Sequence, residues 1–273
     1  IAPLVELLGS ENEVTQDNAV RALLNISSPN VDNRNAVVKP LVVLLEVRNA
    51  LASMKSAQAL MMLAARSTAD RTAIAEAGAI PPLVHMLGDG RNATTPQLRA
   101  AAVLCDLARS SENRQAILDA GGMGPLVKML SSHNTDAHTY AAGAVAHLAA
   151  NSVAQKLISQ YEGIYPLVAL LREASTSIDA ARHAAVALWH MEGSSDNKGA
   201  IVKAGAIPPL VVLLRRADSP EAQEVAAHVL ADLSRHHAGS KAITIASGIP
   251  SLVGLLKAGT TTAMKHAACA LWG

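Results

Sequence analysis

The chain has 273 residues, half of them hydrophobic, and its 23 Lys and Arg residues nearly balance its 22 Asp and Glu residues. This balance argues against a general binder of nucleic acid or anionic membranes, which normally carries a basic excess. The hydrophobic residues are mainly Ala, Leu, Val and Ile, with no Phe, three Tyr and two Trp. Small side chains let helices approach closely, so this composition favours thin layers of stacked helices over one thick globular core.

The cysteines and the hydropathy pattern indicate the compartment. Cys105 and Cys269 lie far apart in Ala-rich stretches, a spacing typical of neither a disulfide framework nor a zinc site. We interpret both as small, buried, reduced residues. No run of the sequence approaches the roughly 18 consecutive apolar residues that a membrane span needs. We therefore expect a cytoplasmic or nuclear protein without a transmembrane segment.

A Pro-Leu-Val motif, closely followed by a pair of Leu or Met residues, recurs along the whole chain. Six copies begin at Pro3, Pro40, Pro82, Pro125, Pro166 and Pro209, and a seventh begins at Ser251 in place of proline. The successive steps are 37, 42, 43, 41, 43 and 42 residues. Roughly 40 residues is the length of one unit in several α-helical repeat arrays. The spacing predicts a single array over residues 1–273, with about seven units of which the first and last are incomplete.

In chain order, each unit is expected to contain three helices. The first is short, as at 113–120 and 197–204, and is followed by Gly121 or Gly205. Glycine tolerates the left-handed conformation that ends a helix. The second helix begins at Ile-Pro-Pro-Leu-Val, as at 80–84 and 207–211, because proline is accepted in the first helical turn.

The third helix of each unit is expected to be the longest. Thr95-Pro96 and Ser219-Pro220 place a capping hydroxyl just before a proline at the first helical position. The pattern Ala-Ala-x-Ala-Leu then recurs, as at 184–188 and again, with one change, from Ala226. Its apolar residues are three and four positions apart, which predicts a helix buried along a broad stripe.

The string Ala-Gly-Ala-Ile-Pro-Pro-Leu-Val at 77–84 and 204–211 resembles the armadillo repeat, and the likeness recurs in register over essentially the whole chain. Residues 16–27 and 197–202 are most similar to the arrays beside plant U-box ubiquitin ligases and in vacuolar armadillo proteins, although this sequence contains no U-box. The resemblance implies an all-α, right-handed superhelical solenoid. A HEAT array is the alternative, but it usually has two helices per unit, and the short first helix bounded by glycine favours armadillo.

The ends of the sequence fall inside expected helices. Residue 1 lies in an expected second helix and residue 273 in an expected third helix. Terminal units of a solenoid normally carry polar capping faces. We therefore expect the chain to be a segment of a longer protein.

The motifs that would indicate catalysis are missing. The glycines at 88–90 and 121–124 do not form Gly-x-Gly-x-x-Gly, and no Gly-x-Ser-x-Gly occurs. His147 and His190 occupy the same position in successive units, but layers of a solenoid are about 10 Å apart. Two nitrogens that share one zinc ion lie only about 4 Å apart. We expect no enzymatic activity, no metal and no cofactor.

The armadillo resemblance further implies a concave groove of third helices, in which peptide binders carry a recurrent Trp and an Asn four residues later. The positions of the Asn hold Asn25, Met62, Asp106, His147, His190, Asp232 and Gly273. The positions of the Trp hold Arg21, Gln58, Ala102, Gly143, Val186, His228 and Cys269. One turn earlier lie Asn18, Lys55, Arg99, Tyr140, His183, Val225 and His266. Only Asn25 matches, which disfavours a nuclear-import adaptor.

These three rows supply the candidate partner-binding residues. Lys55, Arg99 and Tyr140 suit an acidic or aromatic segment, whereas Asp106 and Asp232 suit basic residues. Trp189 and Trp272 precede the Asn positions by one residue, and we expect both to turn towards helix packing. The candidates are Asn18, Arg21, Asn25, Lys55, Gln58, Met62, Arg99, Asp106, Tyr140, His147, His183, His190, His228 and Asp232.

The sequence therefore predicts a non-catalytic protein–protein interaction scaffold that presents its groove to partner proteins or extended peptides. Two alternatives stay open. One is the substrate-recognition array of a ubiquitin-ligase assembly, and the other is a structural subunit packed permanently in a large complex. No nucleic-acid partner is expected.

Overall fold

The computed structural model describes residues 1–27, 30–90 and 93–273, and within these ranges it contains helices and no strands. The residues form two compact units, 1–129 and 130–273, each of which contains several repeats. From here on, the first and second unit are these two parts of the chain. The first unit contains a 3₁₀ turn at Leu7–Gly9 and the helices α1 (Ala2–Glu6), α2 (Glu13–Ser27), α3 (Val31–Leu45), α4 (Ala50–Arg66), α5 (Thr68–Glu76), α6 (Ile80–Leu87), α7 (Thr95–Leu107), α8 (Ser111–Asp119) and α9 (Met123–Met129). The second contains α10 (Thr135–Leu148), α11 (Ser152–Gln160), α12 (Ile164–Leu171), α13 (Ile178–Met191), α14 (Ser195–Lys203), α15 (Ile207–Leu213), α16 (Pro220–Ser234), α17 (His237–Ile245), α18 (Gly248–Ala258) and α19 (Thr261–Trp272).

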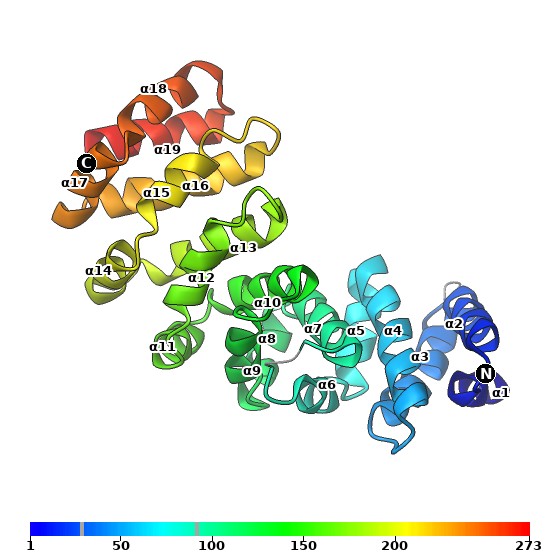
Figure 1. Ribbon diagram of the computed structural model, residues 1–273. Coiled ribbons are helices and arrows are strands. Elements are labelled where there is room, and N and C mark those ends of the chain that lie inside the picture. Colours follow the sequence, from blue (N-terminus) through cyan, green and yellow to red (C-terminus); the bar gives the residue numbers. More distant parts are fainter. Residues whose placement is uncertain (28–29, 91–92) are drawn as a thin grey trace. The chain divides into compact units, whose positions relative to one another are not determined.

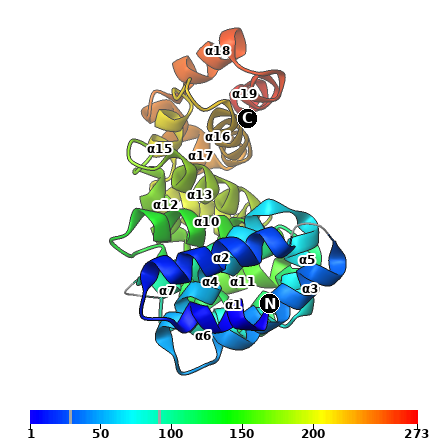
Figure 2. The same cartoon turned by 90° about the vertical axis from the view of Figure 1, so that its right-hand side faces the viewer.

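Helices of the same kind stack in rows within each unit. In the second unit the third helices α10, α13, α16 and α19 pack in succession, and the second helices α12, α15 and α18 form another row (Figure 1). In the first unit α4 packs between the third helices α2 and α7 (Figure 2). The predicted all-α solenoid, with a short first helix, a short second helix and a longer third helix, is confirmed.

Small side chains hold the third helices close together. One position of the third helix is buried in every repeat and holds Ala or Ser. It directly follows the row of Asn18, Lys55 and their equivalents, and its residues are Ala19, Ser56, Ala100, Ala141, Ala184, Ala226 and Ala267. Interhelical distances of 8–10 Å depend on the side chains at the contact. The alanines and one serine therefore set a narrow layer spacing, and larger residues such as Leu188 fill the core beside them.

Five residues at one position of the repeat adopt the left-handed conformation. Gly78, Gly121 and Gly205 have φ of 81°, 79° and 81°, as expected for the glycines that end the first helices. Glu162 and Ser247 occupy the same position with φ of 57° and 56°. The fold therefore imposes this conformation even where the sequence lacks glycine, at a cost of about 1–2 kcal/mol for each side chain.

The repeat that begins at residue 30 departs from the three-helix prediction. Its first and second helices are fused into one helix, α3, with Pro40 inside it. This repeat has a step of 37 residues and lacks the glycine that ends the first helix elsewhere. Without that glycine the chain continues as a helix, and Pro40 removes one backbone hydrogen bond instead of starting a new helix.

The core position of Leu188 gives a direct test of the register. Its side chain is 0% exposed, so Leu188→Ala removes buried methyl groups and leaves a cavity. We expect this variant to lower the free energy of unfolding by about 2–5 kcal/mol, as measured by urea denaturation. The exposed Val212→Ala serves as the control, and a loss below about 1 kcal/mol for Leu188→Ala would contradict the assignment.

The left-handed residues give a second test. Glu162→Gly relieves backbone strain, and we expect it to raise the free energy of unfolding by about 0.5–1 kcal/mol, since the strain removed exceeds the extra chain entropy of glycine. Conversely, Gly121→Ala should destabilise the protein by about 1 kcal/mol through strain alone, because a Cβ atom there meets nothing within 4 Å. Thermal unfolding of both variants measures the two effects, and equal signs would refute the explanation.

Candidate functional site: the surfaces of the third helices

The candidate residues of the first unit differ widely in accessibility. Asn18, Arg21 and Asn25 are exposed along α2, and Met62 of α4 is 39% exposed. Gln58 is half-buried, and its Oε1 atom has no hydrogen-bond partner among the described residues. An incoming ligand can therefore reach the side chains of Asn18, Arg21, Asn25 and Met62. The Oε1 acceptor of Gln58 is unused within the described residues.

Lys55 is buried and already paired. Only 4% of the residue is exposed, and its Nζ atom donates a hydrogen bond of 2.7 Å to Oδ1 of Asp17 on α2. The same nitrogen lies 4.0 Å from Oε1 of Glu13. This bond to Lys55 lowers the pKa of Asp17. Lys55 thus joins α4 to α2, and its charge is satisfied inside the unit.

Arg99 likewise connects two third helices. Its Nη1 atom donates a hydrogen bond of 2.9 Å to the Met54 carbonyl of α4, and burial lowers its pKa. Asp106 is half-buried on α7, with Oδ1 3.7 Å from Nη1 of Arg109. Burial raises the pKa of Asp106. The structure therefore uses Lys55 and Arg99 for internal contacts, and it leaves Asp106 as a partly desolvated acid.

In the second unit, aromatic rings form a row across three third helices. The ring of Trp189 on α13 lies 4.4 Å from that of His228 on α16, and His228 lies 3.9 Å from His266 on α19 at 17° to its plane. Trp189 also stacks on His190 of its own helix at 4.6 Å. We name Trp189, His190, His228 and His266 the aromatic row. Burial lowers the pKa of His228 and of His266, which favours the uncharged rings that can stack at this distance.

The prediction for the two tryptophans needs correction. Trp272 is 84% exposed, so the expectation that it turns into helix packing is wrong: its ring faces solvent. Trp189 is half-buried and packs, but it does so against polar candidate residues instead of the aliphatic core. Cys105 and Cys269 form no disulfide within the described residues, and both are half-buried, where full burial was expected.

A buried carboxyl lies beside the aromatic row. Glu192 follows the last residue of α13 and is 4% exposed, and neither of its carboxyl oxygens has a hydrogen-bond partner among the described residues. Burial, together with the nearby charge of Asp232, raises the pKa of Glu192 to about 10. Asp232 itself lies 3.9 Å from Nε2 of His228 and 3.5 Å from Nη1 of Arg235. At neutral pH Glu192 is therefore protonated, beside the carboxyl group of Asp232.

The remaining candidates occupy α10 and α13. His183 is half-buried, and Nη2 of Arg182 donates to its Nε2 at 2.9 Å. Burial, followed by the charges of Arg182 and His147, lowers the pKa of His183 to about 4. Tyr140 and His147 are half-buried on α10. The imidazole of His183 is therefore uncharged at neutral pH.

Sequence reasoning placed His228, His190 and Asp232 in the candidate surface but missed Glu192. The signal was available in the repeat itself. The position of Glu192 is occupied by buried small residues in other repeats, namely Ser27, Ala64, Ala108, Ala149 and Ser234. A carboxyl at a small-residue position is a departure that an alignment of the repeats reveals, and such departures from local rules mark functional sites.

Comparisons with known proteins agree with this architecture. The profile of the plant U-box protein ARM repeat region matches residues 46–273, and that of the armadillo/beta-catenin-like repeat matches residues 1–28. The chain belongs to the armadillo repeat family. Within that family, its long match is to the ARM repeat region of plant U-box proteins. Comparison with curated proteins gives no match.

Solved armadillo structures are similar over most of the chain. An engineered protein aligns with a TM-score of 0.73 and 33% identity, covering 86% of this chain and 95% of its own. A designed armadillo repeat protein in complex with the peptide (KR)4 aligns with a TM-score of 0.65 and 25% identity, covering 88% and 98%. A structure from work on the interaction between cadherin and beta-catenin shares only the fold, with a TM-score of 0.83, 19% identity and coverage of 99% and 51%.

Two searches of the described residues bear on other kinds of site. No group of three or more His, Cys, Asp or Glu residues is arranged to hold a metal ion within the parts of the armadillo chain that the structure describes. In the same ranges, no single helix is long and apolar enough to cross a membrane. The pair α17 and α18 meets the length and composition limits only when taken together, across a bend of 84°.

The buried carboxyl predicts a specific dependence of stability on pH. Because the folded-state pKa of Glu192 is about 10 and its ordinary value is 4.5, the folded protein binds a proton that the unfolded chain has lost. The stability contributed by the protonated carboxyl of Glu192 is therefore fully present below pH 4.5 and is lost as pH rises towards 10. We expect Glu192→Gln, which mimics the protonated acid, to stabilise the protein by about 1–3 kcal/mol at pH 7.

Urea denaturation at pH 5, 7 and 8.5 measures this effect. The gain from Glu192→Gln should grow with pH, whereas the exposed Glu11→Gln should show no such trend. A stabilisation that does not change across this range would mean that Glu192 is ionised in the folded protein.

Proposed function

We propose that this armadillo chain is a non-catalytic scaffold, and that the third helices of its second unit bind an extended segment of a partner protein. The observation that carries the proposal is the aromatic row, which runs without interruption over α13, α16 and α19. Aromatic faces in successive layers suit a ligand that crosses the helices, because each layer offers a similar contact to the next residues of the ligand.

The charges beside the row favour a basic side chain. Asp232 forms an ion pair with Arg235, whose side chain is 56% exposed and can be displaced by a ligand cation. A guanidinium or ammonium group could then lie against the ring of Trp189 or His228 as well as Asp232. Its approach would also favour ionisation of Glu192, so binding would release a proton. The complex of a designed armadillo protein with (KR)4 supports this class of ligand.

The first unit offers a different, weaker surface. Two of its basic candidates are occupied, Lys55 by Asp17 and Arg99 by the Met54 carbonyl. The residues left accessible are Asn18, Arg21, Asn25 and Met62. A partner segment bound there would meet the cation of Arg21 beside polar and apolar groups, so we assign recognition of basic residues to the second unit.

A second candidate function is the substrate-recognition array of a ubiquitin-ligase assembly in the cytoplasm or nucleus. The match of residues 46–273 to the ARM repeat region of plant U-box proteins favours it. In that case the bound segment would belong to a protein that becomes ubiquitinated. Ubiquitination of captured partners by the full-length protein in a reconstituted reaction would distinguish a ligase array from a simple scaffold.

The third-helix surface can be tested with a library of random 12-residue peptides selected on the purified chain. We expect the enriched peptides to contain Lys or Arg, and we expect the double variant Trp189→Ala, Asp232→Lys to weaken their binding at least tenfold, because it removes one ring and reverses one charge. Fluorescence anisotropy measures the affinities. The control, Lys203→Glu, changes an exposed residue of the first helix α14 and should alter affinity less than twofold.

Circular dichroism and thermal unfolding establish that both variants are folded. Enriched peptides that bind the double variant as well as the wild type would place recognition elsewhere on the chain. Failure of the purified chain to remain monomeric would instead favour a structural subunit of a larger complex.

A further inference from the structure

Pockets recur along the second helices at the period of the repeat. One lies between α3 and α6 in the first unit, and two more lie between α12 and α15 and between α15 and α18 in the second. Each is bounded by the C-terminal end of one second helix and the N-terminal turn of the next. The pocket between α15 and α18, which we name the α15–α18 pocket, has a volume of about 540 Å³ and is the largest of the three.

Two departures from the repeat distinguish the lining of the α15–α18 pocket from that of the other two. Ser251 stands where six other repeats have proline, and Gly254 stands where other repeats carry Val43, His85, Lys128, Ala169 and Val212. Both residues line the pocket. A Cβ atom on Gly254 would meet nothing within 4 Å, so glycine is not required there by packing. Its lack of a side chain leaves space on a helix that would be more stable with a larger residue.

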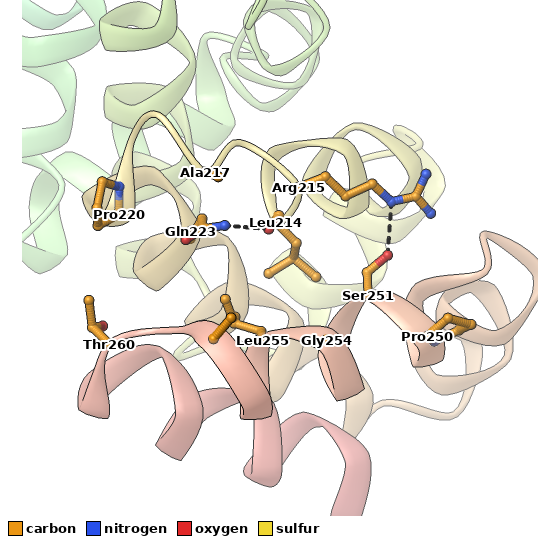
Figure 3. Close-up of a pocket in the computed structure, with 11 residues that line it drawn as sticks. Leu214, Arg215, Ala217, Pro220, Gln223, Pro250, Ser251, Gly254, Leu255 and Thr260 are labelled. Carbon is orange, nitrogen blue, oxygen red and sulfur yellow. Dashed lines mark hydrogen bonds between the residues drawn. The ribbon is translucent and has the colours of Figure 1, made fainter.

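The interior of the pocket is apolar. Leu214 and Leu255 face each other across it, and Pro250 and Gly254 extend the same surface towards solvent (Figure 3). The end near Thr260 is polar, and the side chain of Gln223 there donates a hydrogen bond of 2.9 Å to the Leu214 carbonyl. The middle of the pocket therefore suits one large apolar side chain. The polar end suits the backbone groups of a peptide better than it suits the hydrocarbon chain of a fatty acid.

One cation stands at the mouth. Arg215 is the only charged residue among those that line the pocket, and it is exposed. Its Nε atom donates a hydrogen bond of 2.9 Å to Oγ of Ser251, which fixes the guanidinium at the rim (Figure 3). The neighbouring Arg216 is engaged by Asp218 at 2.9 and 2.8 Å. Arg215 thus keeps its two terminal nitrogens available for an anion, and Arg172 occupies the same position at the end of α12.

We propose that the α15–α18 pocket binds a partner-protein segment in which a large apolar side chain adjoins an Asp or Glu residue. The apolar side chain enters between Leu214 and Leu255, and the carboxylate pairs with the terminal nitrogens of Arg215 in a bidentate geometry. This surface lies on the row of second helices, whereas the function proposed above uses the row of third helices. The two proposals therefore stand on different residues and on ligands of opposite charge.

The test is a selection that demands the pocket. A phage-displayed library of random 12-residue peptides is selected on the immobilised wild-type chain in the presence of excess soluble Gly254→Leu variant, which carries a large side chain on the pocket lining. Enriched peptides are expected to contain Leu, Ile, Met, Phe or Trp next to Asp or Glu. Synthetic versions should lose affinity at least tenfold with Gly254→Leu and with Arg215→Gln, as measured by fluorescence anisotropy.

The chain offers a matched control. Gly199→Leu makes the same substitution in α14, where a Cβ atom also meets nothing within 4 Å, and it should change affinity less than twofold. Asp232→Lys should also leave these peptides unaffected, which separates this proposal from the third-helix surface. Thermal unfolding checks that every variant is folded.

Three outcomes would overturn the proposal. They are the absence of enriched peptides, enrichment of peptides that bind Arg215→Gln as tightly as the wild type, and binding of dodecanoate at the pocket when no peptide binds. The last outcome would identify a fatty acyl chain as the occupant.

Discussion

Close contact between the third helices, made through alanine and serine, is the interaction on which the rest of this structure depends. Ala184, Ala226 and Ala267 are fully buried at equivalent positions of α13, α16 and α19. Because these side chains are small, the helices approach closely and the outward-facing residues of adjacent layers come into contact. The 3.9 Å separation of the His228 and His266 rings is a direct consequence. The same spacing brings Lys55 within hydrogen-bond distance of Asp17 in the first unit.

Several residues of the second unit act against stability, and they are not spread evenly. Glu192 is a buried carboxyl beside Asp232, at a position that elsewhere holds alanine or serine. Gly254 weakens a helix without any packing need. Destabilising features persist when they serve another purpose, and here each lies beside a surface with distinct chemistry. Glu162, in contrast, is strained at a helix end where no binding surface is apparent, and nothing in the structure explains the choice of that residue.

The second unit therefore carries two surfaces of opposite character. The row of third helices combines aromatic rings with Asp232 and Glu192, whereas the row of second helices combines an apolar pocket with Arg215. On the two proposals made above, the scaffold would hold a basic segment and an acidic segment at once, from one partner or from two. Simultaneous binding raises the effective concentration of each segment for its own site, so modest affinities at each surface become a stable assembly.

The sequence by itself determined the helical repeat, its period and the ends of most helices. Those features follow from local chemistry: proline in a first turn, glycine or a strained substitute four residues before five of the motifs, and apolar residues at helical spacing. Even the fused helix α3 is explained by a local cause, the missing glycine and the shortened step. The candidate rows came from the same reasoning, because equivalent positions of a repeat share one face; their role in binding stays a prediction.

Only the tertiary structure decided what those rows do. It showed that Lys55 and Arg99 are used internally, that Trp189 contacts His228, and that Glu192 is buried next to Asp232. None of these pairs joins neighbours in the sequence; each joins residues of successive repeats. Whether two residues in adjacent layers touch depends on helix spacing, rotation and side-chain rotamers, which are set by packing over the whole unit. Charge and aromatic content can be read along the chain, but burial and partnership exist only once the layers are stacked.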